Sequence, residues 1–99
     1  LDAGTTLGVI ERSSGQSWIG SDRMRRALAG DVAPRAHMTL LAKDSGLAVA
    51  AAQRAGHAGV LGPLAAAVFA AALRDGLAGH DDAALLDWMR NHPDGLPRP

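Results

Sequence analysis

A lysine and an aspartate stand side by side, at positions 43 and 44, in a stretch that otherwise consists mostly of small and apolar residues. The stretch runs from Met38 to Gly56, and its apolar residues recur at helical spacing. Adjacent residues on a helix point about 100° apart, so we expect Lys43 or Asp44 to face a cleft or an interface. From spacing alone, however, an exposed and solvated ion pair is favoured, because charged residues on helices usually face solvent.

Three arginines form a second group of possible functional residues, at positions 23, 25 and 26. A short helix that carries them could contact phosphates as part of a helix-turn-helix. The net charge of zero, with Asp22 and Asp31 on either side, instead favours a solvated helix face without a nucleic-acid partner.

His80, Asp81 and Asp82 contain groups that can bind metals, but neighbours in sequence rarely converge on one ion without further ligands. We interpret them as a turn with a capping carboxylate, and we predict no metal site. The other histidines show no ligand spacing, and no serine and histidine arrangement suggests a nucleophile. The chain also lacks GxGxxG and Walker motifs, so we do not expect it to hold a dinucleotide by itself.

The composition limits the class of protein. The chain has 99 residues, enough for one domain, and no cysteine, which excludes disulfides and thiolate zinc sites. Its longest apolar run, 61–73, is too short for a bilayer span and is interrupted by Gly62 and Pro63, so we predict no membrane association and a cytoplasmic location. The first residue is Leu1 rather than methionine, and we expect the chain to be a piece of a larger protein.

Abundant alanine and the lack of alternating runs predict an all-α fold, a compact bundle of about five helices over residues 1–92 with a flexible tail at 93–99. The expected helices and their end signals follow in chain order. They are Asp2 to about Arg12; Ser21 or Asp22 to Gly30, after a loop at 15–20 that holds Trp18; Met38 or Thr39 to Gly56; Pro63 to Asp75, closed by Gly76; and Asp81 or Asp82 to about Asn91.

The helical periodicity also predicts which side chains face the core. In the central helix these are Leu40, Leu47, Ala51 and Ala55, and in the last helix they are Leu85, Leu86, Trp88 and Met89. Gly46 lowers the stability of a helix interior, which suggests that another element packs closely against it.

Several short motifs resemble, in order and spacing, the C-terminal helical domain of the β-hydroxyacid dehydrogenases. This group includes 3-hydroxyisobutyrate, tartronate semialdehyde and L-threonate dehydrogenases and is related to 6-phosphogluconate dehydrogenase. The matching motifs are Leu-Asp at 1–2, Ser-Ser-Gly-Gln-Ser-Trp at 13–18, Gly-Asp at 30–31, Lys-Asp-Ser-Gly-Leu-Ala at 43–48, Gly-Pro at 62–63 and Asp-Gly-Leu-Ala-Gly-His-Asp-Asp-Ala-Ala-Leu at 75–85.

The resemblance implies an NAD(P)-dependent oxidoreductase acting on a small hydroxy acid, in which a separate Rossmann domain binds NAD or NADP and the helical domain closes the cleft. It implies that Lys43 contacts the cofactor, that Asp44 shapes the substrate side, and that the acid/base lysine lies upstream of Leu1. A chain without those parts is expected to be inactive alone and to associate into a homo-oligomer.

One position departs from the family pattern. Members commonly have phenylalanine eight residues before the aspartate, where this chain has Ala36, which implies a differently lined pocket. The alternative function is a non-catalytic helical module for interaction or oligomerisation, formed by the alanine-rich faces. A weaker alternative is nucleic-acid binding through the three arginines.

Overall fold

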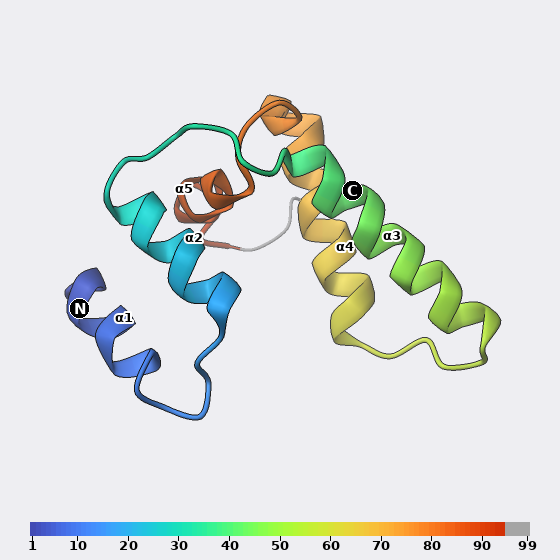
Figure 1. Cartoon of the computed structure of the whole chain (residues 1–99). Helices are drawn as coiled ribbons and strands as arrows, with labels where there is room; N and C mark the ends of the chain where they lie inside the picture. The colour runs from blue at the N-terminus through green and yellow to red at the C-terminus, as the bar shows by residue number, and fades with distance from the viewer. Residues whose placement is uncertain (95–99) are drawn as a thin grey trace.

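The computed structural model describes residues 1–94, and five α-helices account for most of them (Figure 1). The helices are α1 (Ala3–Ile10), α2 (Trp18–Leu28), α3 (Met38–Arg54), α4 (Leu61–Ala72) and α5 (Leu85–Arg90). A π-helical turn, η1 (Leu73–Leu77), follows α4, and a 3-10 turn, η2 (Asp82–Ala84), precedes α5. Residues 1–94 contain no strand, which confirms the all-α prediction for that range. Most of the tail predicted at 93–99 lies outside the described residues.

Local signals explain most helix ends. Asp2 caps α1, because its Oδ1 accepts the N–H of Thr5 at 2.7 Å. Gly56 follows α3 with a φ of +74°, and Gly76 lies within η1 with a φ of +94°; glycine adopts both without a Cβ penalty. Asp81 caps η2 by accepting the N–H of Ala83 at 3.0 Å. These ends confirm the predicted turns at 56, 76 and 81, whereas α4 begins at Leu61 and not at Pro63 as predicted.

The start of α2 was predicted wrongly. The helix begins at Trp18 rather than after Gly20, because Ser17 is the cap and its Oγ accepts the N–H of Gly20 at 3.1 Å. A Cβ at position 20 would lie only 2.7 Å from the Ser17 hydroxyl oxygen. Glycine at position 20 therefore makes room for this earlier cap, and Trp18 becomes part of the first helical turn.

The helices form two groups joined near one end of α3. α3 and α4 pack antiparallel as a hairpin, and α1, α2 and α5 lie to the other side (Figure 1). The core lies where the groups meet, and it consists of Met38, Ala71, Ala72 and Trp88. The hairpin projects from this core, and the radius of gyration is 14.5 Å, compared with about 13 Å for a typical domain of this length.

Several residues predicted to face inward are exposed instead. The exposed fractions are 49% for Leu40, 60% for Leu47 and 53% for Met89, whereas Trp88 is buried as predicted. Among residues 1–94 nothing lies within 4 Å of a Cβ built on Gly46, so this part of the chain does not provide the expected close packing there. The reason is that the main partner of α3 among the described residues is α4, which covers a narrower face than the periodicity indicates.

Candidate functional site

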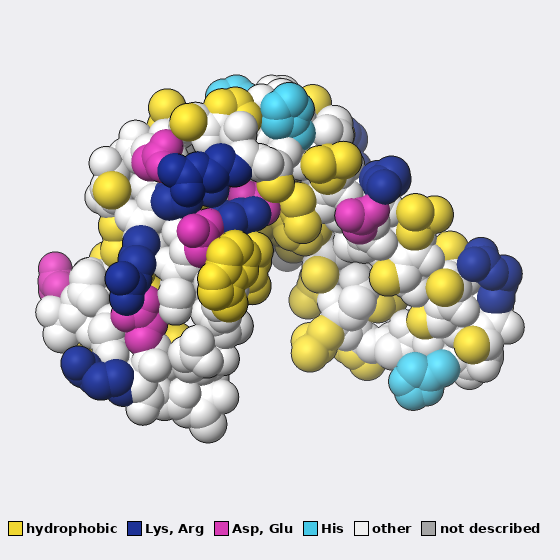
Figure 2. All heavy atoms as spheres, in the orientation of Figure 1, with side chains coloured by type: hydrophobic (Ala, Val, Ile, Leu, Met, Phe, Trp, Pro, Cys, Tyr) yellow, Lys and Arg dark blue, Asp and Glu magenta, His cyan; other side chains and the backbone are white. Residues whose placement is uncertain are grey.

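Lys43 and Asp44 form an exposed ion pair on α3. Lys43 Nζ lies 2.7 Å from Asp44 Oδ1, and 60% and 64% of the two side chains are accessible. In the view of Figure 2 the hairpin has hydrophobic side chains with few charged groups among them. The solvated pair that spacing alone favoured is therefore what the chain shows, and the roles in cofactor and substrate binding stay predictions.

The donor set at Lys43 fits an anionic or hydroxyl-rich ligand such as a nicotinamide dinucleotide. An ammonium group has three N–H donors, and the ion pair with Asp44 is the contact of Lys43 within residues 1–94, so it can also bind a phosphate, ribose hydroxyl or carboxylate. The long side chain of lysine also lets the charge reach a ligand while α3 keeps its backbone in place. This pair is the part of the chain that fits a cofactor contact.

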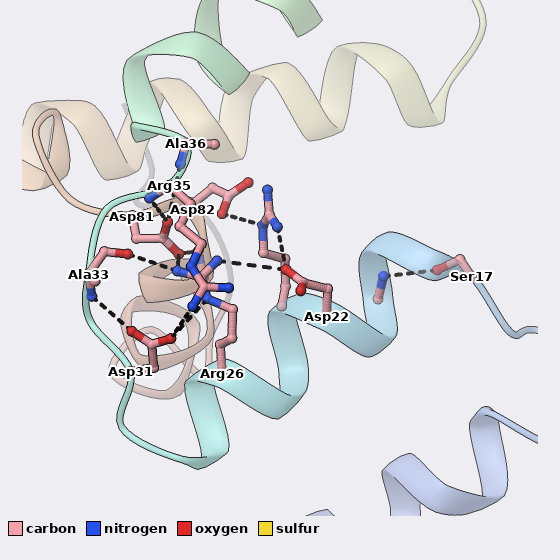
Figure 3. A network of polar contacts seen from close by, with 12 residues as sticks. Ser17, Asp22, Arg26, Asp31, Ala33, Arg35, Ala36, Asp81 and Asp82 are labelled. Atoms are coloured by element: carbon pink, nitrogen blue, oxygen red, sulfur yellow. Dashed lines mark hydrogen bonds and ion pairs between the residues drawn. The ribbon is translucent and has the colours of Figure 1, made fainter.

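A second polar cluster, which we call the Arg26 network, is built around a buried arginine (Figure 3). Arg26 is 6% exposed, and its Nη2 lies 3.1 Å from Asp81 Oδ2 and 2.8 Å from the carbonyl oxygen of Ala33. Its Nε lies 3.4 Å from Asp31 Oδ2, while Nη1 is buried without a hydrogen-bond partner. Burial among several acceptors keeps the guanidinium charged and fixes its position.

The prediction of a solvated arginine face is wrong for two of the three arginines. Besides Arg26, Arg23 is partly buried, and its Nε donates to Asp82 Oδ1 at 2.6 Å. Of the three, only Arg25 is exposed. It forms a bidentate pair with Glu11, in which Nε and Nη2 donate to Oε1 and Oε2, both at 2.8 Å. All three arginines thus make contacts with acidic side chains or carbonyl oxygens of the same chain.

Asp81 is the acidic centre of the Arg26 network. Its Oδ1 accepts the N–H groups of Arg35 at 2.8 Å and Ala36 at 3.3 Å, and its Oδ2 accepts that of Ala83 at 3.0 Å. Burial on its own raises the pKa of Asp81, but the N–H groups of Arg35 and Ala83 and the Arg26 guanidinium outweigh it. The pKa of this carboxyl therefore lies well below its ordinary value.

A third cluster joins Trp88 of α5 and His92, which follows α5, to Asp75 of η1. The indole N–H of Trp88 donates to Asp75 Oδ2 at 2.8 Å, and the ring of Trp88 stacks on His92 with centroids 4.2 Å apart. His92 Nδ1 lies 2.7 Å from the Trp88 carbonyl oxygen, and its Nε2 lies 3.4 Å from Asp75 Oδ2. These contacts hold the residues after α5 against the base of the hairpin.

A hollow of about 340 Å³ lies between α3 and α4, and two other apolar hollows border the helices; none of the three is lined by Lys43 or Asp44. One, of about 330 Å³, lies between the two helix groups, with Met24 on one wall and Leu41 and Phe69 on the other, and the Arg23–Asp82 pair at its edge. The other, of about 480 Å³, lies between α1, α2 and α5. Neither combines charged groups into a reaction centre.

Among residues 1–94 no group of three histidine or acidic side chains is arranged to hold a metal ion. Within the same range no helix is long and apolar enough to cross a membrane.

Sequence reasoning missed the Arg26 network. Met24, Ala27 and Leu28 form the apolar face of α2 by helical spacing, and Arg26 falls on the opposite side, so helical periodicity places it in solvent. The available signal was the acidic residue at i−4, Asp22, and the one at i+5, Asp31. Neither reveals the distant partner, Asp81, which only the fold brings within reach.

Comparisons with known proteins give two findings. Residues 1–89 match the family model described as NAD-binding of NADP-dependent 3-hydroxyisobutyrate dehydrogenase. The structure is also similar to a crystal structure of 3-hydroxyisobutyrate dehydrogenase (ygbJ) from Salmonella typhimurium, with a TM-score of 0.81 and 27% identity over 87% of this chain. No curated protein sequence gives a significant match.

The chain spans 30% of the length of that Salmonella protein. The family description names NAD and NADP, in agreement with the cofactor predicted from the resemblance. The match extends across four of the five helices and nearly all of α5. This chain therefore belongs to the family described as NAD-binding of NADP-dependent 3-hydroxyisobutyrate dehydrogenase.

Proposed function

We propose that this chain is the helical domain of an NAD(P)-dependent 3-hydroxyacid dehydrogenase and supplies one wall of its cofactor and substrate cleft. The observation that carries the proposal is the exposed Lys43, whose ammonium group pairs within residues 1–94 only with Asp44 and lies on a helix of a domain from an NAD-binding family. Lys43 and Asp44 line neither of the two hollows described above nor the hollow of about 340 Å³ between α3 and α4, so in this proposal the opposite wall of the cleft is formed by other parts of the enzyme.

In this proposal the chain binds and orients, and it does not move a proton. Lys43 binds an anionic or hydroxyl group of the dinucleotide, while the adjacent Asp44 holds the ammonium group and lies toward the hydroxy acid. When bound there, NAD or NADP would supply hydride transfer to or from the hydroxy acid. The acid/base lysine implied by the resemblance lies outside the chain, so the chain alone is inactive.

The test is dinucleotide binding by the complete protein that carries this chain. Lys43→Ala should raise the dissociation constant for NAD or NADP about tenfold, because a hydrogen bond to a charged group contributes about 1.5–3 kcal/mol. Lys43→Arg should recover part of the affinity. Arg54→Ala, which removes another basic residue near the end of α3, is the matched control and should leave binding unchanged.

A dissociation constant for Lys43→Ala within about twofold of the wild-type value would remove Lys43 from the cofactor site. Titration by fluorescence or calorimetry measures this without relying on turnover. Measuring KM for several hydroxy acids in Asp44→Asn then examines the substrate side separately.

One observation favours a second function, that of a helical module for association with a second copy. The hairpin exposes large apolar side chains on both of its helices, including Leu47, Leu61 and Leu64. Sedimentation of the complete protein, combined with dinucleotide binding, distinguishes the two functions. A discrete oligomer that Leu47→Glu dissociates, together with unchanged dinucleotide affinity in Lys43→Ala, would favour the module over the dehydrogenase domain.

A further inference from the structure

The start of α3 is held by a distant turn rather than by a cap of its own. His37 precedes the helix, but its side chain makes no capping hydrogen bond. Instead the N–H of Met38 donates to the carbonyl oxygen of His80 at 2.9 Å, and the N–H of Thr39 donates to that of Ala78 at 3.4 Å. The turn at 78–80 therefore satisfies backbone donors that the first turn of a helix normally leaves free.

The same two segments are joined a second time on the other side of His37. The N–H of Asp82 donates to the carbonyl oxygen of Ala36 at 2.8 Å, and His37 and Asp81 form an isolated antiparallel bridge. Together these contacts make a short junction between residues 35–39 and 78–83. The position of this junction therefore determines where the first turn of α3 lies.

Asp81 is the buried acidic side chain that ties this junction together (Figure 3). One oxygen binds the chain that leads into α3, through the N–H groups of Arg35 and Ala36, and the other binds Ala83 and the Arg26 guanidinium. Arg26 belongs to α2, so a single carboxylate connects the start of α3 to α2 and to η2.

Lys43 lies only five residues after the first residue of α3, and an α-helix is stiff over that length. A change in the direction of α3 at the junction would therefore displace the ammonium group. A displacement of about 1 Å is enough to weaken a hydrogen bond whose partner is held elsewhere.

We propose that Asp81 is a positioning residue, which fixes the start of α3 relative to α2 and thereby places Lys43 against the cofactor. The placement of Lys43 against the cofactor rests on the proposed function. The fixing of α3 relative to α2 rests on the contacts of Asp81 alone. Asp81 contacts no ligand in this scheme and takes no part in the reaction.

The first experiment is a double-mutant cycle in the complete protein, read out as the dissociation constant for NAD or NADP. The single variants are Lys43→Ala and Asp81→Asn, with Asp87→Asn as the matched control. Asp87 is an aspartate on α5 with 76% of its side chain exposed, and it pairs only with Arg90 among the ion pairs of residues 1–94. The amide in Asp81→Asn keeps the size of the side chain but can accept hydrogen bonds with only one of its two ends.

If Asp81 acts through Lys43, then Lys43→Ala weakens binding about tenfold in the wild-type background and less than about twofold in Asp81→Asn. In Asp87→Asn the effect of Lys43→Ala should remain about tenfold. An equal loss in the Asp81→Asn and wild-type backgrounds would overturn the proposal, because a merely structural role leaves the two effects additive.

A second experiment measures the direction of α3 without any ligand. The 99-residue chain has no cysteine, so spin labels can be attached to Ala29→Cys after α2 and Gln53→Cys near the end of α3, both exposed sites. The label distance should be narrowly distributed in the wild type and in Asp87→Asn, and broader or shifted in Asp81→Asn. An unchanged distribution in Asp81→Asn would overturn the fixing of α3.

The two experiments separate the possible failures. Loss of any Lys43→Ala effect in the wild type contradicts the proposed function, and the label distance still decides whether Asp81 fixes α3. Should Asp81→Asn not fold, Arg26→Lys loosens the same junction from α2 by replacing the guanidinium fork with one ammonium group. The same broadening and the same loss of Lys43 dependence are then expected.

Discussion

Different kinds of contact stabilise the two helix groups, that of α1, α2 and α5 and that of the α3–α4 hairpin. Around α2, buried and partly buried arginines pair with aspartates from distant parts of the chain, as at Arg26 and Asp81. In the hairpin, small apolar residues dominate, and half of the twelve residues of α4 are alanine. Figure 2 shows the charged side chains gathered over the first group and hydrophobic ones over the second. Directional contacts thus fix the base of α3, whereas the far end of the hairpin depends on weakly specific packing.

The largest expected effect comes from removing the core that both groups share. Met38 is fully buried against Ala71, Ala72 and Trp88, so Met38→Ala should lower the free energy of unfolding by about 2–5 kcal/mol. Met89→Ala makes the same chemical change at a side chain that is 53% exposed, and it should cost about 0.5 kcal/mol. Urea unfolding followed by circular dichroism compares them, and similar losses would mean that the groups do not share one core.

Acid should selectively remove the stabilisation that the Arg26 network gives to the folded chain. The pKa of Asp81 is lowered in the folded chain, so the unfolded state binds its proton first as the pH falls. The stabilisation is complete well above the ordinary aspartate pKa of about 3.9, and it is lost progressively as the pH falls through that value toward the lower folded one. The free energy of unfolding should therefore drop with acid less steeply in Asp81→Asn than in the wild type.

Asp87→Asn is the control for this pH dependence and should keep the wild-type slope. Some slope should remain in Asp81→Asn, because hydrogen bonds also lower the pKa of Asp2, Glu11 and Asp31. Unfolding curves measured from pH 7 to pH 2 supply the comparison. Parallel slopes in the wild type and Asp81→Asn would show that the Arg26 network does not govern acid stability.

The smallest expected effect concerns the hairpin alone. A Cβ at Gly46 meets nothing within 4 Å, so Gly46→Ala should raise the free energy of unfolding by about 0.5–1 kcal/mol through helix propensity. Gly56 has a φ of +74°, and Gly56→Ala should instead lower it by about 1–2 kcal/mol. Thermal unfolding of both variants gives the signs, and destabilisation by Gly46→Ala would point to an unrecognised packing partner.

The helices themselves could be predicted from local signals. Alanine content, the cap at Asp2 and the glycines at 56 and 76 act within a few residues, so the sequence alone places them. The start of α2 was missed because Ser17 and Ser21 are both good caps, and the space above Gly20 decides between them. The resemblance identified the family, which composition and periodicity could not.

The Arg26 network could not be predicted from local signals, because its main contact joins residues that are 55 positions apart in the chain, 26 and 81. Likewise, helical periodicity indicates which residues share a face but not whether a partner covers it. Leu47 fits the apolar stripe and is nonetheless 60% exposed. The depth at which a side chain is buried depends on tertiary packing, which the pattern does not encode.

The stacking of Trp88 on His92 makes the intrinsic tryptophan fluorescence of the chain sensitive to the contacts of the residues after α5. Its two tryptophans differ sharply, since Trp18 is 72% exposed and Trp88 is 6% exposed. Emission from Trp18 is that of an indole in water, whereas emission from Trp88 depends on the imidazole stacked on it and on its hydrogen bond to Asp75. Release of His92 from these contacts would therefore change the fluorescence of Trp88, while the fluorescence of Trp18 serves as an internal reference.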